Sequence, residues 1–183
     1  MRRLRYSVAM SLDGYIAGPN GEADWILTDP EIDFGAIFSE FDTLLMGRRT
    51  YAAMGMKGGA GGGPFGGLKI VVVSRTLDQR DHPKVTVISD RLREAVSALK
   101  TQSGKDIWLF GGGDLFRSLL DLGLVDTVEV AMIPVLLGDG IPLLPRPSGR
   151  ASLTLTSHRV FQQTGTLSLA YDVKRQGKRR RTR

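Results

Sequence analysis

The chain has 183 residues, of which 42% are hydrophobic and 24% are charged, a composition typical of a single globular domain. No apolar run approaches the roughly 18 residues that a membrane span needs. The basic N-terminus is followed by polar residues and glycines, which do not form the apolar stretch of a signal peptide. We therefore expect a cytoplasmic protein without membrane contact.

The absence of cysteine excludes disulfides and thiolate chemistry, and two distant histidines, His82 and His158, argue against a metal site.

The formal net charge of +6 comes from the C-terminal end of the chain. Residues 174–183 contain seven lysines and arginines and no acid, which leaves the other 173 residues with a net charge of −1. We expect residues 1–173 to form one domain and residues 174–183 to form a disordered, solvated tail. A contact of this tail with nucleic acid or another polyanion is the alternative.

The N-terminal part of the chain predicts a strand, a helix and a second strand. Apolar and polar residues alternate from Leu4 to Met10, as in a strand. Turns are expected at Asp13-Gly14 and at residues 18–21. Residues 31–41 have an apolar helical face, and the short apolar segment from Thr43 to Met46 that ends at Gly47 reads as a buried strand.

The central and C-terminal parts predict further alternation of strands and helices. Eight of the thirteen residues from Gly55 to Gly67 are glycine, which favours a loop. Residues 153–160 and 166–173 alternate around a short turn, as in a hairpin. Strands are expected at residues 68–73, 84–88, 106–110 and 125–133, and helices at residues 90–102 and around residues 115–120. The fold class is therefore α/β, a three-layer α/β/α sandwich on a mostly parallel central sheet with an antiparallel C-terminal hairpin.

Three segments at predicted strand ends suit an anion. Gly111, Gly112 and Gly113 lie between a strand and a helix and leave backbone N–H groups accessible, although a tight connection would use the same residues. Gly47, Arg48, Arg49 and Thr50 begin a new helix with two guanidinium groups and a hydroxyl; a solvated helix start is the alternative. Ser74 and Arg75 suit a ribose 2′-phosphate. All three should lie at one edge of the sheet, where open α/β sheets bind ligands.

Five motifs, in order and with matching spacing, resemble the reductase domain of riboflavin biosynthesis, which is the C-terminal domain of the bifunctional deaminase-reductase. Read more loosely, the same skeleton is similar to dihydrofolate reductase. Because no zinc-binding deaminase domain precedes the chain, we expect a stand-alone member. The motifs are Tyr6–Ala17, Leu45–Tyr51, Val72–Arg75, Leu109–Gly113, and Val125-Asp126 with Pro134–Leu143.

The resemblance implies NADPH as the cofactor and gives each anion segment a role. Arg48, Arg49 and Thr50 would hold the pyrophosphate or the adenosine phosphate, and Ser74 and Arg75 the 2′-phosphate. Gly111 to Gly113 would hold the pyrophosphate and the nicotinamide ribose. The backbone groups of Ala9, Ile16 and Ala17 match positions that bind the nicotinamide carboxamide in dihydrofolate reductase.

Hydride transfer needs alignment and exclusion of water, and it needs no nucleophile. In dihydrofolate reductase a carboxylate before the Gly-Arg motif binds the pteridine ring, and the matching stretch here contains Glu31 and Asp33. Both are therefore candidate catalytic residues, with first-turn helix acids as the alternative. Asp13 is either a turn residue or a catalytic one.

The leading hypothesis is an NADPH-dependent reductase of a small heterocycle, most of all a ribosylaminopyrimidine of the riboflavin pathway. A dihydrofolate, pterin, carbonyl or imine substrate would leave the same motifs unchanged. A non-catalytic nucleotide- or RNA-binding protein is the alternative from another class. The resemblance also implies a homodimer, formed by the hairpin over residues 153–173.

Overall fold

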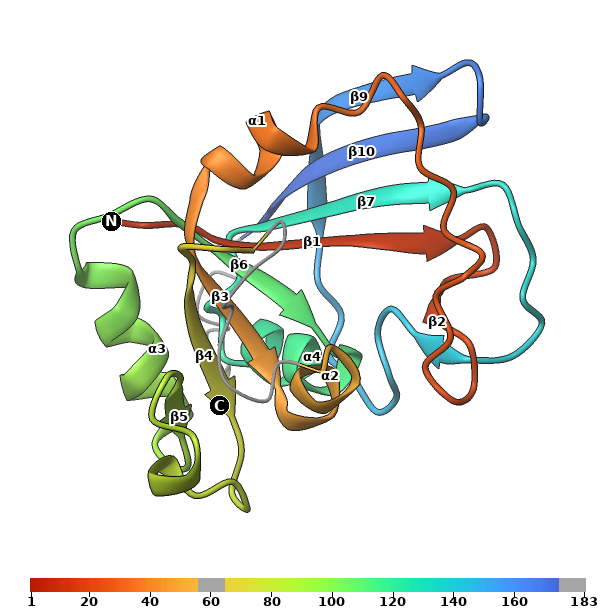
Figure 1. Cartoon of the computed structure of the whole chain (residues 1–183). Coiled ribbons are helices and arrows are strands. Elements are labelled where there is room, and N and C mark those ends of the chain that lie inside the picture. The colour runs from red at the N-terminus through yellow and green to blue at the C-terminus, as the bar shows by residue number, and fades with distance from the viewer. Residues whose placement is uncertain (56–64, 175–183) are drawn as a thin grey trace, which may run out of the picture.

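The protein is described by a computed structural model over residues 1–55 and 65–174. Its centre is a twisted eight-stranded sheet with the strand order β5-β4-β3-β6-β1-β7-β10-β9 (Figure 1). β10 pairs antiparallel with β7 and β9, and the other pairs in the sheet are parallel. The strands are β1 (Leu4–Ser11), β3 (Phe41–Gly47), β4 (Lys69–Val73), β5 (Thr86–Ile88), β6 (Asp106–Gly111), β7 (Thr127–Ile133), β9 (Leu153–Phe161) and β10 (Thr166–Val173).

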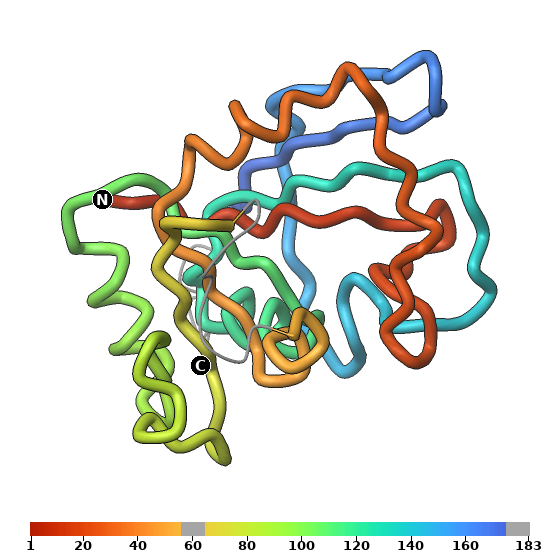
Figure 2. Tube along the Cα trace, viewed as in Figure 1, coloured from red at the N-terminus to blue at the C-terminus, as the bar shows by residue number. Residues whose placement is uncertain are grey.

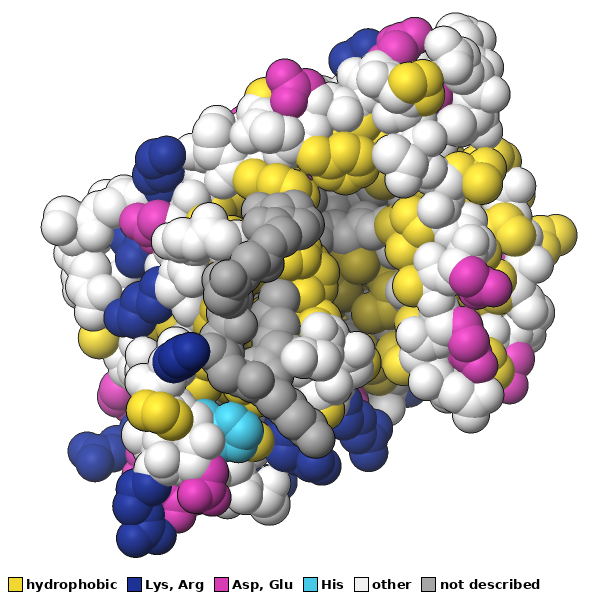
Figure 3. Space-filling view, viewed as in Figure 1, with side chains coloured by type: hydrophobic (Ala, Val, Ile, Leu, Met, Phe, Trp, Pro, Cys, Tyr) yellow, Lys and Arg dark blue, Asp and Glu magenta, His cyan; other side chains and the backbone are white. Residues whose placement is uncertain are grey.

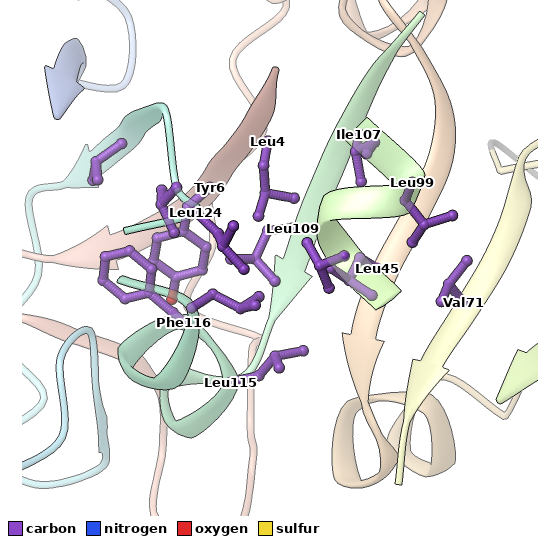
Figure 4. Close-up of a cluster of buried hydrophobic side chains, with 14 of the residues drawn as sticks. Leu4, Tyr6, Leu45, Val71, Leu99, Ile107, Leu109, Leu115, Phe116 and Leu124 are labelled. Carbon is purple, nitrogen blue, oxygen red and sulfur yellow. The ribbon is translucent and has the colours of Figure 1, made fainter. Parts of the chain in front are cut away.

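Helices cover both faces of the sheet, so the predicted three-layer α/β/α sandwich is confirmed. One face packs against α3 and α4 through a core that includes Tyr6 and Leu109 (Figure 4). The other face packs against α1 and α2 through a second core that includes Met46 and Trp108. The helices are α1 (Phe34–Ser39), α2 (Arg48–Ala53), α3 (Leu92–Thr101) and α4 (Gly113–Asp121), with a 3-10 turn at Gln79–Asp81.

The burial of each strand follows its sequence pattern. In β1, Leu4 and Tyr6 are fully buried on the α3/α4 face, and the Tyr6 ring stacks on Phe116 with the ring centroids 3.9 Å apart. β4 contains the continuous apolar run, and Val71 and Val72 are both buried although they point to opposite faces. This burial on both faces is expected of a strand inside a parallel sheet.

The helix predicted at residues 31–41 is shorter in the structure. α1 begins at Phe34 because Asp33 adopts a non-helical conformation and its side chain accepts a hydrogen bond from the Ala36 N–H. The residues before it form a turn around Asp29, whose backbone carbonyl accepts from the Ile32 N–H and whose carboxylate accepts from the Glu31 N–H. The chain enters β3 at Phe41, two residues before the predicted start.

A second, two-stranded sheet was not predicted. It joins β2 (Tyr15–Ala17) to β8 (Ile141–Pro142), which lie side by side at the right of the molecule in Figures 1 and 2. The glycine-rich segment falls mostly outside the described residues, as does the basic tail beyond Lys174. Within residues 1–55 and 65–174, no helix is long and apolar enough to cross a membrane.

Candidate active site

The three predicted anion segments lie together at the carboxyl edge of the sheet. β4, β3 and β6 are parallel neighbours, and their last residues are in register: Gly47 pairs with Val73, and Met46 pairs with Gly111. The residues that follow each strand therefore project from the same edge. α2, α4 and the ends of β3 and β6 meet there (Figure 1).

The glycine turn contacts the start of α2. A Cβ atom built on Gly111 or on Gly112 would lie 3.5 Å from the Thr50 hydroxyl, so the two segments form one surface. The peptide bond between Gly111 and Gly112 is cis. Gly112 is the N-cap of α4 and offers no side chain to satisfy the first N–H groups of that helix, which leaves those groups available to an anion.

Gly113 connects this surface to the second sheet. A Cβ atom at Gly113 would lie 2.7 Å from the carbonyl oxygen of Pro142 and 2.8 Å from Cδ of Pro145, closer than real Cβ contacts allow. Glycine is required here by the approach of β8. The strip of candidate residues thus continues from Thr50 through the glycine turn to β8 and its partner β2.

β2 carries two of the predicted cofactor residues, Ile16 and Ala17, and both are half-buried. Ala17 pairs with Ile141, and a Cβ atom on Gly140 would lie only 2.2 Å from the Ala17 carbonyl oxygen. Ala9, the third predicted residue, lies on β1 in register with Ala131 of β7. The structure thus places all three around the carboxyl end of β1.

Asp13 fixes the β1–β2 turn to the loop after β7. Its carboxylate accepts hydrogen bonds from the Ser11 hydroxyl at 2.6 Å, from the Gly138 N–H at 2.8 Å and from the Leu137 N–H. These bonds hold the pKa of Asp13 below its usual value, with the Ser11 bond the largest cause. Asp13 is exposed, and its contacts are those of a residue that connects two loops.

The segment after β4 borders an open hollow of about 320 Å³. Ser74 is buried, and its hydroxyl accepts hydrogen bonds from the N–H groups of Thr76 and Leu77, so it holds the turn. Arg75 is exposed and lines the hollow. Thr76 and Ser89 also line it and were missed from the sequence, although Ser89 follows β5 as Ser74 follows β4.

A deep hollow lined mainly by hydrophobic side chains opens on the α1/α2 face of the molecule (Figure 3). In this view α1 lies above it, the segment over residues 18–33 lies to its right, and β1 and β7 lie behind it. The side chains that face this side from β1, β7 and β10 are mostly small. In register they are Ser7, Glu129 and Ala170 in one row, and Ala9, Ala131 and Ser168 in the next.

Aromatic rings line the same face of the sheet. The Phe38 ring centroid lies 5.5 Å from that of Trp108 and 5.9 Å from that of Phe34, and Phe34 of α1 is 42% exposed. Phe110 packs edge-on against Trp108 at 5.2 Å. Such rings offer flat apolar surfaces to a planar ligand.

Glu129 is the carboxylate on the floor of this face, and sequence reasoning missed it. The guanidinium group of Arg5 donates to both of its oxygens, at 2.7 and 2.9 Å, and also donates to Glu40. Burial would lower the pKa of Arg5, but the bonds to Glu129 and Glu40 outweigh burial and raise it. The alternation of residues 127–133 separates Glu129 from Val128 and Val130, but it does not tell which of the two faces is left open.

The two predicted catalytic acids lie at the start of α1 and have structural partners. Asp33 uses one carboxylate oxygen as the N-cap of the helix. Glu31 forms an ion pair with Arg159 of β9 at 2.6 Å. Asp33 therefore has a structural role at the helix start, as the N-cap and not in the first turn, whereas Glu31 lies outside the helix.

Comparison with known sequences identifies relatives of this chain. The family model of the RibD C-terminal domain matches residues 2–167. YyaP of Bacillus subtilis (strain 168), named as an uncharacterized protein, is 35% identical over 179 residues, which cover 93% of this chain and 94% of YyaP.

Comparison with solved structures finds the same fold. A Shewanella sp. PV-4 protein, provisionally named as a riboflavin biosynthesis protein, has a TM-score of 0.78 and 26% identity, and the match covers 96% of this chain and all of that one. Dihydrofolate reductase from Enterococcus faecalis, solved with NADP(H), has a TM-score of 0.69 at 19% identity and covers 94% and 97%. The deaminase and 5-amino-6-(5-phosphoribosylamino)uracil reductase of Thermotoga maritima has a TM-score of 0.70 at 15% identity, over 94% of this chain and 57% of that one.

Proposed function

The chain belongs to the family of the RibD C-terminal domain, and we propose that it is an NADPH-dependent reductase of a small planar heterocycle of the ribosylaminopyrimidine type. The observation that carries this proposal is the continuous strip of candidate residues along one edge of the sheet. It runs from Arg75 past Thr50 and the glycine turn to β2, and it passes beside the hollow on the α1/α2 face.

The strip suits an extended dinucleotide. β4 and β1 are three strand spacings apart in the sheet, which is about 14 Å. Arg75, Thr76 and Ser89 would bind the adenosine end with its 2′-phosphate. Arg48, Arg49 and Thr50, with Gly111 to Gly113, would bind the pyrophosphate.

The nicotinamide end would then lie against Ala9, Ile16 and Ala17, next to the hollow. The small side chains of β1 and β7 leave room there for two stacked rings, which is the alignment that hydride transfer needs. The bound cofactor supplies the hydride, and the protein supplies orientation and exclusion of water. We propose Glu129 as an acceptor for an N–H group of the substrate, through the second lone pair of Oε2, which accepts one bond from Arg5.

Asp33 and Glu31 remain proposals as substrate contacts. Asp33 is the better placed of the two, because the Glu31 carboxylate is occupied by Arg159. We also propose that two copies pair through β9 and β10, and that the protein is cytoplasmic. A pterin reductase is the second candidate function, favoured by the similarity to the dihydrofolate reductase fold.

Titration with NADPH and with NADH, followed by cofactor fluorescence, tests the proposal. We expect NADPH to bind about tenfold more tightly or better, because Arg75 can pair with the 2′-phosphate. Arg75→Ala should remove most of this preference. Lys84→Ala is the matched control, since Lys84 is an exposed cation shortly before β5 that does not line the hollow.

If neither cofactor binds the wild-type protein, the proposal is wrong. If NADPH binds, its oxidation by a ribosylaminouracil and by dihydrofolate separates the two candidate functions. Faster oxidation by the ribosylaminouracil supports the riboflavin-type reductase, and faster oxidation by dihydrofolate supports the pterin reductase.

A further inference from the structure

The charges of the chain are divided between the two sides of the candidate site. The forty-two residues from Tyr6 to Gly47 contain no lysine or arginine, and neither do residues 118–145. Residues 48–117, which carry the proposed cofactor contacts, contain twelve lysines and arginines and six acids. The acids of the first segment are Asp13, Glu22, Asp24, Asp29, Glu31, Asp33, Glu40 and Asp42.

This division follows the geometry of the site. Residues 6–47 form β1, β2, α1 and the segment that borders the hollow on its right side, and Figure 3 shows acidic side chains on that side. Lysine and arginine side chains gather below and to the left of the hollow, around the cofactor half of the sheet. A ligand in the hollow therefore meets acidic side chains on its right side, which we call the acidic rim, and the strip carries the exposed cations Arg48, Arg49 and Arg75.

Two described arginines on the face of the sheet that borders the hollow are already paired. Arg5 is bound by Glu129 and Glu40, and its guanidinium group also lies over the Phe41 ring. Arg159 is bound by Glu31 and lies over the Phe161 ring. Using Arg5 for a phosphate would leave the partly buried Glu129 without its partner, which is unfavourable. The Arg159–Glu31 pair is exposed and opposes such use less.

Several acids of residues 6–47, the stretch that supplies the acidic side of the hollow, have no cationic partner in the contacts above. Asp13 is bound by backbone N–H groups, and Glu22 accepts hydrogen bonds from Asn20. Asp24 is exposed on the same segment. These carboxylates would repel an incoming phosphate dianion.

From this we infer that the substrate of the hollow is a planar heterocycle that carries no phosphate group. The flat rings of Phe34 and Phe38 and the small floor residues suit an uncharged aromatic ring, and the acidic rim disfavours a phosphorylated one. The inference rests on the proposed function. It separates this chain from the Thermotoga maritima relative, whose printed name specifies a phosphoribosylamino compound.

Calorimetric titration of the full-length protein saturated with NADP⁺ tests the inference, because the oxidised cofactor allows binding without turnover. Two matched pairs serve as probes: 5-amino-6-(5-phosphoribosylamino)uracil with its dephosphorylated form, and flavin mononucleotide with riboflavin. We expect the unphosphorylated member of at least one pair to bind about tenfold more tightly at low ionic strength, and this ratio to shrink as salt is added.

A charge variant tests whether the rim is the cause. Asp24→Lys should improve binding of the phosphorylated member several-fold and leave the unphosphorylated member unchanged. Asp121→Lys makes the same charge change at the end of α4, at the other end of the sheet, and should leave both unchanged.

Equal or tighter binding of the phosphorylated members would overturn the inference, and so would a failure of both unphosphorylated compounds to bind. NADP⁺ binding is measured first in the same instrument. Its absence would contradict the proposed function itself, so the two failures are distinguishable.

Discussion

At the scale of single residues, the glycines of the candidate site differ in the space that a side chain would find at each position. A Cβ atom on Gly113 would overlap Pro142 and Pro145, whereas a Cβ atom on Gly47 would meet nothing within 4 Å. We expect Gly113→Ala to lower the free energy of unfolding by about 1–3 kcal/mol, although alanine is the better helix former. Gly47→Ala, at an ordinary φ of −82°, should change it little. Urea unfolding of both variants checks this, and equal stability would contradict the packing argument.

Tyr6 has a buried hydroxyl without a hydrogen-bond partner in the described part of the chain. Such a group is costly, so Tyr6→Phe should raise the free energy of unfolding by about 1 kcal/mol. Tyr51→Phe is the control, because the Tyr51 hydroxyl bonds to His82 at 3.2 Å, and its loss should lower stability.

The buried Tyr6 hydroxyl also makes the free energy of unfolding depend on pH. Burial raises the pKa of Tyr6 above its ordinary value of 10.0. Above that pH the unfolded chain releases the proton while the folded protein keeps it, so stability falls as the pH rises. We expect Tyr6→Phe to remove this part of the alkaline loss in urea unfolding at pH 9 to 11, measured against Tyr51→Phe. An unchanged slope would show that the hydroxyl is not buried as described.

Sequence reasoning found the residues at strand ends more reliably than the residues on faces. Gly47, Ser74 and Gly111 could be predicted because each directly follows an apolar run that is typical of a buried strand. Glu129 could not, because its position on the open face depends on which side of β7 the helices cover. The place of Ser89 in the candidate site could not be predicted either, because it depends on the pairing of β5 with β4.

At the scale of elements, the mouth of the candidate site, by which we mean the β2–β8 pair and the loop after β7, depends on contacts between distant segments. The β2–β8 pair, the bonds from Asp13 to the loop after β7, and the Leu143 N–H bond to the Gly14 carbonyl join residues more than one hundred positions apart. No local pattern predicts such pairing. The same reason explains why α1 was predicted too long, since the turn around buried Asp29 is held in part by Thr164 of the C-terminal hairpin.

Removing the Asp13 carboxylate should loosen this mouth without unfolding the domain. We expect Asp13→Ala to increase hydrogen exchange at the Leu137 and Gly138 amides and to raise KM for the substrate more than it lowers kcat, because the loop is positioned by these bonds. Asp81→Ala changes an exposed acid in the 3-10 turn Gln79–Asp81, outside the β2–β8 region, and should leave both measurements unaffected.

The pKa of Asp13 gives the direction of the pH effect on the same contact. Since the pKa is lowered in the folded protein, the contact contributes fully above the ordinary value of 3.8 and is lost as the pH falls through the lowered value. Protection of the Gly138 amide that disappears already at neutral pH would show that Asp13 does not hold the loop.

At the scale of the whole molecule, the alternation of strands and helices was sufficient to predict the layers and the mostly parallel sheet. The order of strands beyond β1 was not predictable in the same way, because β6 and β7 both pair with β1 although they are separated by α4. That arrangement brings the basic edge proposed for the cofactor and the acidic side proposed for the substrate to opposite sides of the candidate site.

The antiparallel end of the sheet gives the last prediction. All of β9 except Phe161 is exposed, and its apolar residues Leu153, Leu155 and Val160 are 40%, 49% and 49% exposed. Leu153 pairs with Val173 of the α3/α4 core, and Leu155 pairs with Tyr171, which is in register with Val128 of the same core. No described helix covers these residues of β9. An apolar face of this kind on an edge strand favours association.

We therefore expect the wild-type protein to be a dimer in light scattering at micromolar concentration, and Leu155→Lys to be a monomer, because the lysine would place a charge in the apolar interface. Thr154→Lys is the matched control, since Thr154 pairs with Asp172 and points to the opposite face. It should remain dimeric. A monomeric wild-type protein would mean that this face is covered by something other than a second copy, and a dimeric Leu155→Lys variant would place the interface elsewhere.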